Sequence, residues 1–117
     1  MAEYLLLHNP QCSKSRAAKA MLEARGVDFD VREYLKEPMS LDELRILKKR
    51  LGRDPGEWLR WSEAEARQAG LTRDDAPMDL LRAMADNPRL IERPILIHGD
   101  RAAVGRPGPE ALEPLLR

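Results

Sequence analysis

The sequence predicts an α/β fold in which two strand-bearing ends enclose a helical middle. Residues 4–31 have the pattern of a strand, a helix and a second strand, and such a unit has parallel strands joined by a right-handed crossover. Residues 94–104 return to short apolar runs that are typical of strands. Because no linker, repeat or low-complexity tract separates these parts, we expect one domain over residues 1–117, with the helical stretch of about 38–88 as an insertion.

The first expected strand is the apolar run of residues 4–7, which ends at the turn signal Asn9-Pro10. The residues that follow favour a helix as far as Gly26, a natural left-handed cap. Residues 27–31 then alternate apolar and charged side chains, with the apolar ones at the odd positions. This alternation predicts a half-buried strand.

The helical middle carries several start and stop signals. The expected starts have a capping box, or an N-cap followed by proline, or a first-turn proline: Ser40 with Glu43, Asp54 with Pro55, Ser62 with Glu65, and Pro77. The expected stops are a glycine or an Asn-Pro pair: Gly52, Gly70 and Asn87-Pro88. Leucines at helical spacing fill the first of these segments, which indicates one apolar face.

The last third predicts a hairpin and a terminal helix. Residues 94–97 are apolar and β-branched, Gly99-Asp100 suits a two-residue turn, and residues 102–104 run back. Residues 105–108 form a rigid bend rich in glycine and proline, and residues 109–116 are expected to be helical.

The only cysteine, Cys12, stands where the first loop meets the first helix. Unpaired backbone N–H groups and the helix macrodipole favour a negative charge there, so the thiol should lose its proton more easily than a free one. Lys14 and Arg16 either add positive potential or point into solvent. The alternative for a lone cysteine is a small buried hydrophobic residue, but the polar context Gln-Cys-Ser-Lys-Ser is not a core pattern. We therefore expect a reactive thiol.

Composition excludes several classes of function. The 20 basic and 20 acidic residues cancel, which gives no electrostatic case for binding nucleic acid or an anionic membrane. A single cysteine excludes an internal disulfide and a cysteine-rich zinc site, and no metal is expected. We find no signal segment and no apolar run of membrane-spanning length, so we expect a cytoplasmic protein, in the reducing compartment where a lone thiol survives. Nothing in the sequence calls for more than a monomer.

Several short segments, spread in order over nearly all of the chain, form one pattern. They are residues 8–16 (His-Asn-Pro-Gln-Cys-Ser-Lys-Ser-Arg), residues 34–38, Leu59-Arg60, residues 87–95 and residues 105–107. This pattern resembles the glutaredoxin-dependent arsenate reductases, the ArsC family. The resemblance implies a thioredoxin-like fold: a mixed four-stranded sheet flanked by helices, with a helical insertion.

The resemblance also implies the site residues. The catalytic cysteine of the family's His-Asn-Pro-x-Cys motif matches Cys12, and the histidine that is thought to assist the thiolate matches His8, for which a turn-stabilising role is the alternative. Three arginines bind the oxyanion and stabilise the thiolate, and they match Arg60, Arg93 and Arg106. Pro94, after the second of these arginines, resembles the cis-proline that thioredoxin-like folds hold beside the reactive sulfur.

The arginines also have a physical rationale. A thiolate that attacks a phosphate-like oxyanion brings two negative charges together, and guanidinium groups stay charged and match tetrahedral oxyanions with a planar fork. They also lower the pKa of a nearby thiol. Arg93 precedes a proline and Arg106 lies between glycine and proline, so both have rigid backbones at strand ends. The assignment of Arg60 to the site depends chiefly on the family resemblance.

The cysteine count constrains the reaction that the resemblance implies. Reduction of As(V) to As(III) takes two electrons, and one thiol cannot supply them by forming a disulfide within the chain. Ser15, in the place of a second cysteine, cannot resolve a disulfide. We therefore expect Cys12 to form a thiol-arsenate adduct, glutathione as cosubstrate to reduce the arsenic, and the partner glutaredoxin to resolve the mixed disulfide. No bound cofactor is expected.

Two other functions stay open. One is a regulator that resembles the Spx proteins, which share this fold and bind RNA polymerase; many carry a Cys-x-x-Cys switch, whose second cysteine is Ser15 here. The other is a glutathione-linked thiol reductase that is not specific for arsenate. The arsenate reductases that resemble low-molecular-weight phosphatases are excluded, because they need a Cys-x5-Arg loop and Ala18 stands in the arginine's place.

Overall fold

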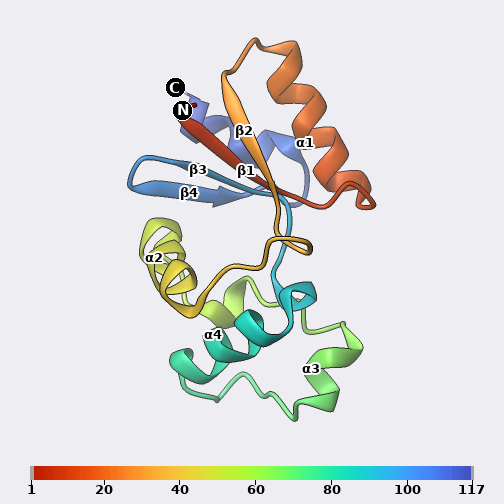
Figure 1. Cartoon of the computed structure of the whole chain (residues 1–117), viewed down its shortest axis with the longest axis vertical. Coiled ribbons are helices and arrows are strands. Elements are labelled where there is room, and N and C mark those ends of the chain that lie inside the picture. Colours follow the sequence, from red (N-terminus) through yellow and green to blue (C-terminus); the bar gives the residue numbers. More distant parts are fainter. Residues whose placement is uncertain (1, 117) are drawn as a thin grey trace.

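The computed structural model describes residues 2–116 and confirms the mixed four-stranded sheet, in the order β2-β1-β3-β4. Strand β1 (Tyr4–His8) lies in the middle and pairs in parallel with β2 (Phe29–Glu33). On its other side β1 pairs antiparallel with β3 (Ile95–His98), which in turn pairs antiparallel with β4 (Arg101–Val104). The expected parallel unit and the expected hairpin are both present (Figure 1).

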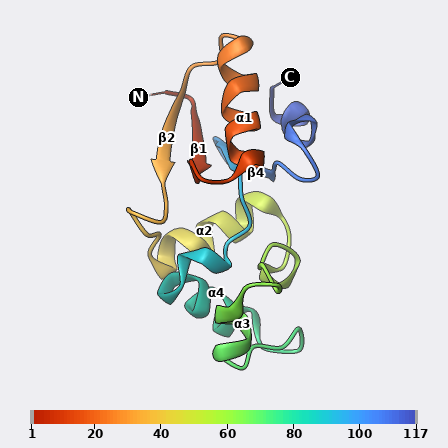
Figure 2. The ribbon, with the colours of Figure 1, turned by 90° about the vertical axis from the view of Figure 1, so that its right-hand side faces the viewer.

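One face of the sheet is covered by α1 (Ser13–Ala24) and by the terminal 3-10 helix η3 (Pro109–Leu116). Leu6 of β1 and Leu96 of β3 project to this side. They pack with apolar residues of the two helices: Ala18, Leu22, Leu112 and Leu115. Figure 2 shows α1 and the C-terminal segment on the same side of the strands. The alternation of side chains along a strand sends the neighbours of Leu6 to the opposite face.

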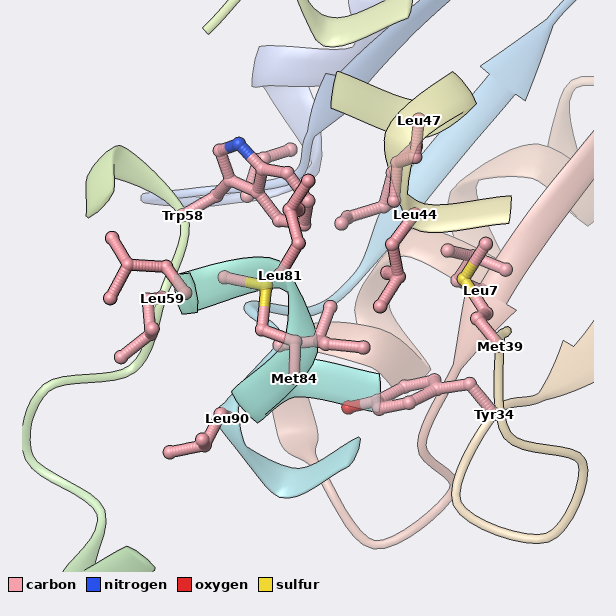
Figure 3. Packing of buried hydrophobic residues seen from close by; sticks show 14 of the residues in the cluster. Leu7, Tyr34, Met39, Leu44, Leu47, Trp58, Leu59, Leu81, Met84 and Leu90 are labelled. Atoms are coloured by element: carbon pink, nitrogen blue, oxygen red, sulfur yellow. The ribbon is translucent and has the colours of Figure 1, made fainter. Parts of the chain in front are cut away.

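A larger apolar cluster joins that opposite face to the helical stretch. Leu7, Ile95 and Ile97 project into it from the sheet. The helical stretch consists of α2 (Leu41–Leu51), η1 (Pro55–Glu57), α3 (Ala64–Gln68), α4 (Pro77–Asp86) and η2 (Pro88–Leu90). Figure 3 shows side chains of these helices meeting Leu7 and Tyr34 in one core. Among residues 2–116 no helix combines the length and apolar character needed to cross a membrane.

Several predicted helix ends are confirmed. At the start of α2, the Ser40 hydroxyl accepts from the Glu43 N–H at 3.1 Å while the Glu43 carboxylate accepts from the Ser40 N–H at 3.0 Å, which is the reciprocal capping box. Gly52 ends α2 with a φ of 65°, and Gly26 follows α1 with a φ of 67°. These left-handed conformations explain why glycine stands at both positions.

Two details of the sequence prediction are wrong. Ser62 and Glu65 do not form a capping box: the N-cap of α3 is Glu63, and it makes no side-chain cap hydrogen bond. The Glu65 carboxylate lies 3.5 Å from Arg89 instead. Val31 was expected to face inward, yet it is 39% exposed. Strand β2 is an edge strand, so fewer neighbours cover its side chains than cover those of β1.

Candidate active site

The loop between β1 and α1 holds Cys12 at the N-cap of α1. The Cys12 N–H donates to the Asn9 carbonyl and the Cys12 carbonyl accepts from the Arg16 N–H, both at 3.0 Å. Asn9 organises the rest of the loop: its side-chain oxygen accepts from the Gln11 N–H at 3.0 Å, and its N–H donates to the buried Ser15 hydroxyl at 3.3 Å. The turn expected at Asn9-Pro10 is thus present, and its hydrogen bonds fix the backbone that positions the thiol.

Strands β3 and β4 bring Arg93 and Arg106 to the edge of the sheet where this loop begins. Arg93 lies two residues before β3, with Pro94 between them, and the Arg106 Nε donates to the Arg93 carbonyl at 2.8 Å. The Gly105 N–H donates to the Pro94 carbonyl at 2.8 Å, and a side chain at Gly105 would approach Pro94 to 2.7 Å, so glycine is needed there. The Arg93-Pro94 peptide bond is cis, as the family resemblance implied.

Arg60 reaches the same place from the helical stretch through a short antiparallel pairing. Leu59 and Ile91 form an isolated bridge. On either side of it, the Arg60 N–H donates to the Leu90 carbonyl at 2.7 Å and the Glu92 N–H donates to the Trp58 carbonyl at 3.0 Å. The backbone around residue 91 therefore connects Arg60 to the segment that carries Arg93.

Two carboxylates link the three guanidinium groups. Glu92 Oε1 lies 3.4 Å from Arg106 Nε and 3.9 Å from Arg60 Nε. Glu63 Oε1 lies 3.6 Å from Arg60 Nη2 and 3.9 Å from Arg93 Nη1. Neither carboxylate was predicted as a site residue, although Glu63 is three residues after Arg60 and Glu92 precedes Arg93. The structure therefore brings all three predicted arginines into one charged cluster.

Some of the donors in this cluster are free. Among residues 2–116, Arg60 Nη1 and Arg93 Nε are buried side-chain nitrogens without a hydrogen-bond partner. Their side chains are only 19% and 15% exposed. Buried donors in folded proteins are nearly always paired, and guanidinium groups bind oxyanions especially well. Two unpaired guanidinium donors in one cluster are therefore an arrangement that an anionic ligand would complete.

The Cys12 sulfur lies at this cluster, with Arg106 Nη2 donating to Sγ at 3.8 Å. Burial by itself would raise the pKa of the Cys12 thiol, but the opposing interactions together hold the pKa below its usual value. These are, in order, hydrogen bonds from the Ser15 N–H, the Arg93 side chain and the Lys14 N–H, followed by the charge of Arg93. Lys14 thus acts through its backbone. Arg16 is turned away, because its side chain donates to the Pro10 carbonyl at 3.0 Å.

The lowered pKa gives a pH dependence for alkylation of Cys12. A thiol reacts through its thiolate, so a lower pKa keeps the reactive form populated at lower pH. We expect the pH profile of the iodoacetamide rate to have its midpoint below that of free cysteine, and the profile of the urea-unfolded protein to move back up. Mass spectrometry of the single modified residue gives the rates. A native midpoint equal to or above the unfolded one would contradict this assignment.

His8 lies at the end of β1 and is only 5% exposed. Burial lowers the pKa of its imidazole, the charges of Lys19 and Arg16 lower it further, and Glu33 opposes the shift. Together these effects favour the neutral form of the ring, and its Nδ1 has no partner within residues 2–116. No hydrogen bond joins His8 to Cys12 in the described part of the chain, so its support of the thiolate stays a prediction.

A pocket of about 190 Å³ opens beside the cluster. Its lining residues come from the Cys12 loop, the end of β2 and the approach to β3: Asn9, Gln11, Tyr34, Leu35, Arg89 and Arg93. Arg93 belongs both to this pocket and to the hydrogen bonds that act on the Cys12 thiol. The pocket is polar along the loop and includes Arg93 of the charged cluster, which suits an anionic ligand.

The model of the ArsC family matches residues 7–113, which include the loop, the three arginines and the helical stretch. The chain belongs to the ArsC family. An arsenate reductase of Neisseria meningitidis is 43% identical over 109 residues, which cover 92% of this chain and 93% of that protein. The solved arsenate reductase of Vibrio cholerae has the same fold, with a TM-score of 0.89, 36% identity, and coverage of 96% of this chain and 97% of its own.

Proteins that are less similar to this chain include transcriptional regulators. The global transcriptional regulator Spx 1 of Oceanobacillus iheyensis is 30% identical over 101 residues, which cover 86% of this chain and 77% of that protein. The identity is lower than for the arsenate reductases of Neisseria meningitidis and Vibrio cholerae. The comparisons thus confirm the family resemblance that the sequence motifs carry.

Proposed function

We propose that this protein is an arsenate reductase in which Cys12 is the nucleophile. One observation carries the proposal: the Cys12 sulfur accepts from Arg106, in a cluster where Arg60 and Arg93 each have a buried N–H without a partner among residues 2–116. The main electrostatic obstacle to this reaction is the repulsion between the negative oxyanion and the negative thiolate. Guanidinium groups reduce this repulsion because their positive charges lie close to both. The 43% identity to a protein named arsenate reductase supports the same substrate.

The proposed first step joins Cys12 to the substrate. The thiolate attacks arsenic, a sulfur–arsenic bond forms, and one arsenic–oxygen bond breaks as the oxygen takes up protons from solvent and leaves as water. Arsenic is still As(V) in this adduct. Arg60, Arg93 and Arg106 bind the remaining oxygens, and the lowered pKa of Cys12 increases the fraction of thiolate at a given pH.

The proposed reduction uses thiols from outside the chain, which has no second cysteine. A glutathione thiolate attacks the Cys12 sulfur, and the sulfur–arsenic bond breaks with its electron pair left on arsenic, which departs as arsenite. The two electrons that arsenic gains come from the two thiols, which are oxidised to the Cys12–glutathione disulfide. Glutaredoxin attacks the glutathione sulfur of this disulfide and restores the Cys12 thiol. Glutathione and glutaredoxin are thus the two electron donors that we propose.

A coupled assay tests this function. Purified protein with glutathione, glutaredoxin, glutathione reductase and NADPH is expected to oxidise NADPH only when arsenate is added, and omission of glutathione or glutaredoxin should stop turnover. Phosphate in place of arsenate is the control, because thiols do not reduce it. Absence of arsenate-dependent oxidation by folded, reduced protein would refute the proposal. Oxidation driven by a disulfide substrate without arsenate would favour the thiol reductase instead.

A non-enzymatic regulator is the second candidate, and the identity of 30% to an Spx protein is the observation that favours it. Retention of the three arginines around a single thiol favours the enzyme, because a partner-binding surface does not need an oxyanion site beside a nucleophile. Capture of RNA polymerase subunits by the immobilised protein, with no arsenate-dependent turnover, would reverse this order.

A further inference from the structure

Tyr34 lies at the edge of the sheet where the Cys12 loop begins. It follows β2 directly, and the parallel register pairs His8 with Glu33. The first residue after β1 is Asn9 and the first residue after β2 is Tyr34, so the register predicts that Tyr34 lies beside the first residue of the loop. Both residues line the pocket that also contains Arg93.

The Tyr34 side chain is fully buried, yet its hydroxyl has no hydrogen-bond partner among residues 2–116. The ring packs in the larger apolar cluster, and Figure 3 shows its hydroxyl directed to the side where Met84 and Leu90 lie. Tyr4 behaves in the ordinary way, because its hydroxyl donates to the Leu115 carbonyl at 3.0 Å. A buried hydroxyl without a partner is costly, so its presence at this position calls for an explanation.

The charges around the Tyr34 hydroxyl are those of the site. Burial raises its pKa to about 12, the charges of Cys12 and Glu92 also raise it, and the charges of Arg93 and Arg106 oppose the shift. The hydroxyl therefore stays protonated throughout the physiological pH range and can donate a hydrogen bond. An oxyanion would provide the acceptor that residues 2–116 do not.

We propose that the Tyr34 hydroxyl is a hydrogen-bond donor to the oxyanion that binds over Cys12, alongside the free N–H groups of Arg60 and Arg93. This inference rests on the proposed function and adds a substrate-binding residue to it. A neutral donor gives the site a contact that adds no further positive charge to the cluster. Tyr34 then contributes to anion affinity through a directed hydrogen bond.

The substitution Tyr34→Phe removes only the hydroxyl and keeps the ring in the core. Two quantities are measured: the melting temperature, and the arsenate concentration that halves the rate of Cys12 alkylation by iodoacetamide. We expect the concentration to rise about 10- to 100-fold, the range of one hydrogen bond to a charged group. The melting temperature should stay the same or rise, because an unpaired buried hydroxyl is lost.

Tyr4→Phe is the matched control, and we expect the opposite result: a lower melting temperature and an unchanged arsenate concentration. The Tyr4 hydroxyl is paired with Leu115, and Tyr4 starts β1 whereas the Cys12 loop follows the other end of that strand. If Tyr34→Phe leaves the arsenate concentration unchanged, or lowers the melting temperature as the control does, the proposal for Tyr34 is overturned and the proposed function stands. If arsenate does not protect Cys12 in the unsubstituted protein, the oxyanion site itself is refuted, and Tyr34 with it.

Discussion

Cys12→Ser is expected to abolish arsenate-dependent NADPH oxidation. The chain contains no other cysteine, and a serine hydroxyl at the same N-cap stays protonated at neutral pH, so neither the sulfur–arsenic adduct nor the mixed disulfide can form. Serine is itself a favoured N-cap residue, so the start of α1 is preserved. The coupled assay measures the loss, and circular dichroism with thermal melting establishes that the variant is folded.

Ser13→Ala is the control for this loop, because the Ser13 side chain is exposed and next to Cys12. It should retain turnover close to that of the unsubstituted protein. Turnover by folded Cys12→Ser at more than a trace of the original rate would remove the nucleophile from the proposed reaction.

Arg93→Gln is expected to lower kcat/KM for arsenate by about 10²- to 10³-fold, the range measured when one preorganised donor is removed from a charge-stabilising site. The guanidinium of Arg93 has a second effect, because its hydrogen bond and its charge lower the pKa of the Cys12 thiol. The variant should therefore also show a higher midpoint in the pH profile of alkylation. Steady-state kinetics gives the first effect and the alkylation rates give the second.

Arg89→Gln makes the same change of charge at the same pocket and serves as the matched control. Its side chain is 65% exposed and pairs with Glu65 at 3.5 Å, away from the carboxylates that hold the site arginines. We expect a small effect on kcat/KM and no change in the alkylation profile. Equal losses in the two variants would mean that general positive charge at the pocket, and not the position of Arg93, supports the reaction.

Local sequence signals predicted most of the fold. The capping box of Ser40 and Glu43 and the glycines after α1 and α2 act within one or two turns of the chain, so their chemistry can be identified from neighbouring residues. The wrong predictions depend on distant neighbours. Glu65 is drawn to Arg89 of η2, and the exposure of Val31 follows from the position of β2 at the sheet edge. Neither relationship is visible over a short stretch of sequence.

Some residues of the candidate site could likewise be predicted from the sequence, whereas others required the folded structure. The position of Cys12 at a helix start follows from the strand–loop–helix pattern, and the three arginines were identified through the family motifs rather than through spacing. The carboxylates of Glu63 and Glu92 bridge arginines that lie up to tens of residues apart in the chain, so pairing them requires the folded structure. Tyr34 belonged to a matching segment, but only its burial and unpaired hydroxyl single it out.

The two carboxylates also determine how the site attracts its ligand. Once Cys12 is a thiolate, the positive charges of the three arginines are balanced by that thiolate together with Glu63 and Glu92. The whole chain is likewise neutral, with 20 basic and 20 acidic residues. Long-range electrostatic steering therefore contributes little to the encounter with an anion. Capture depends on short-range, directional hydrogen bonds that form only after a tetrahedral anion has entered, so shape and donor geometry govern which anions are retained.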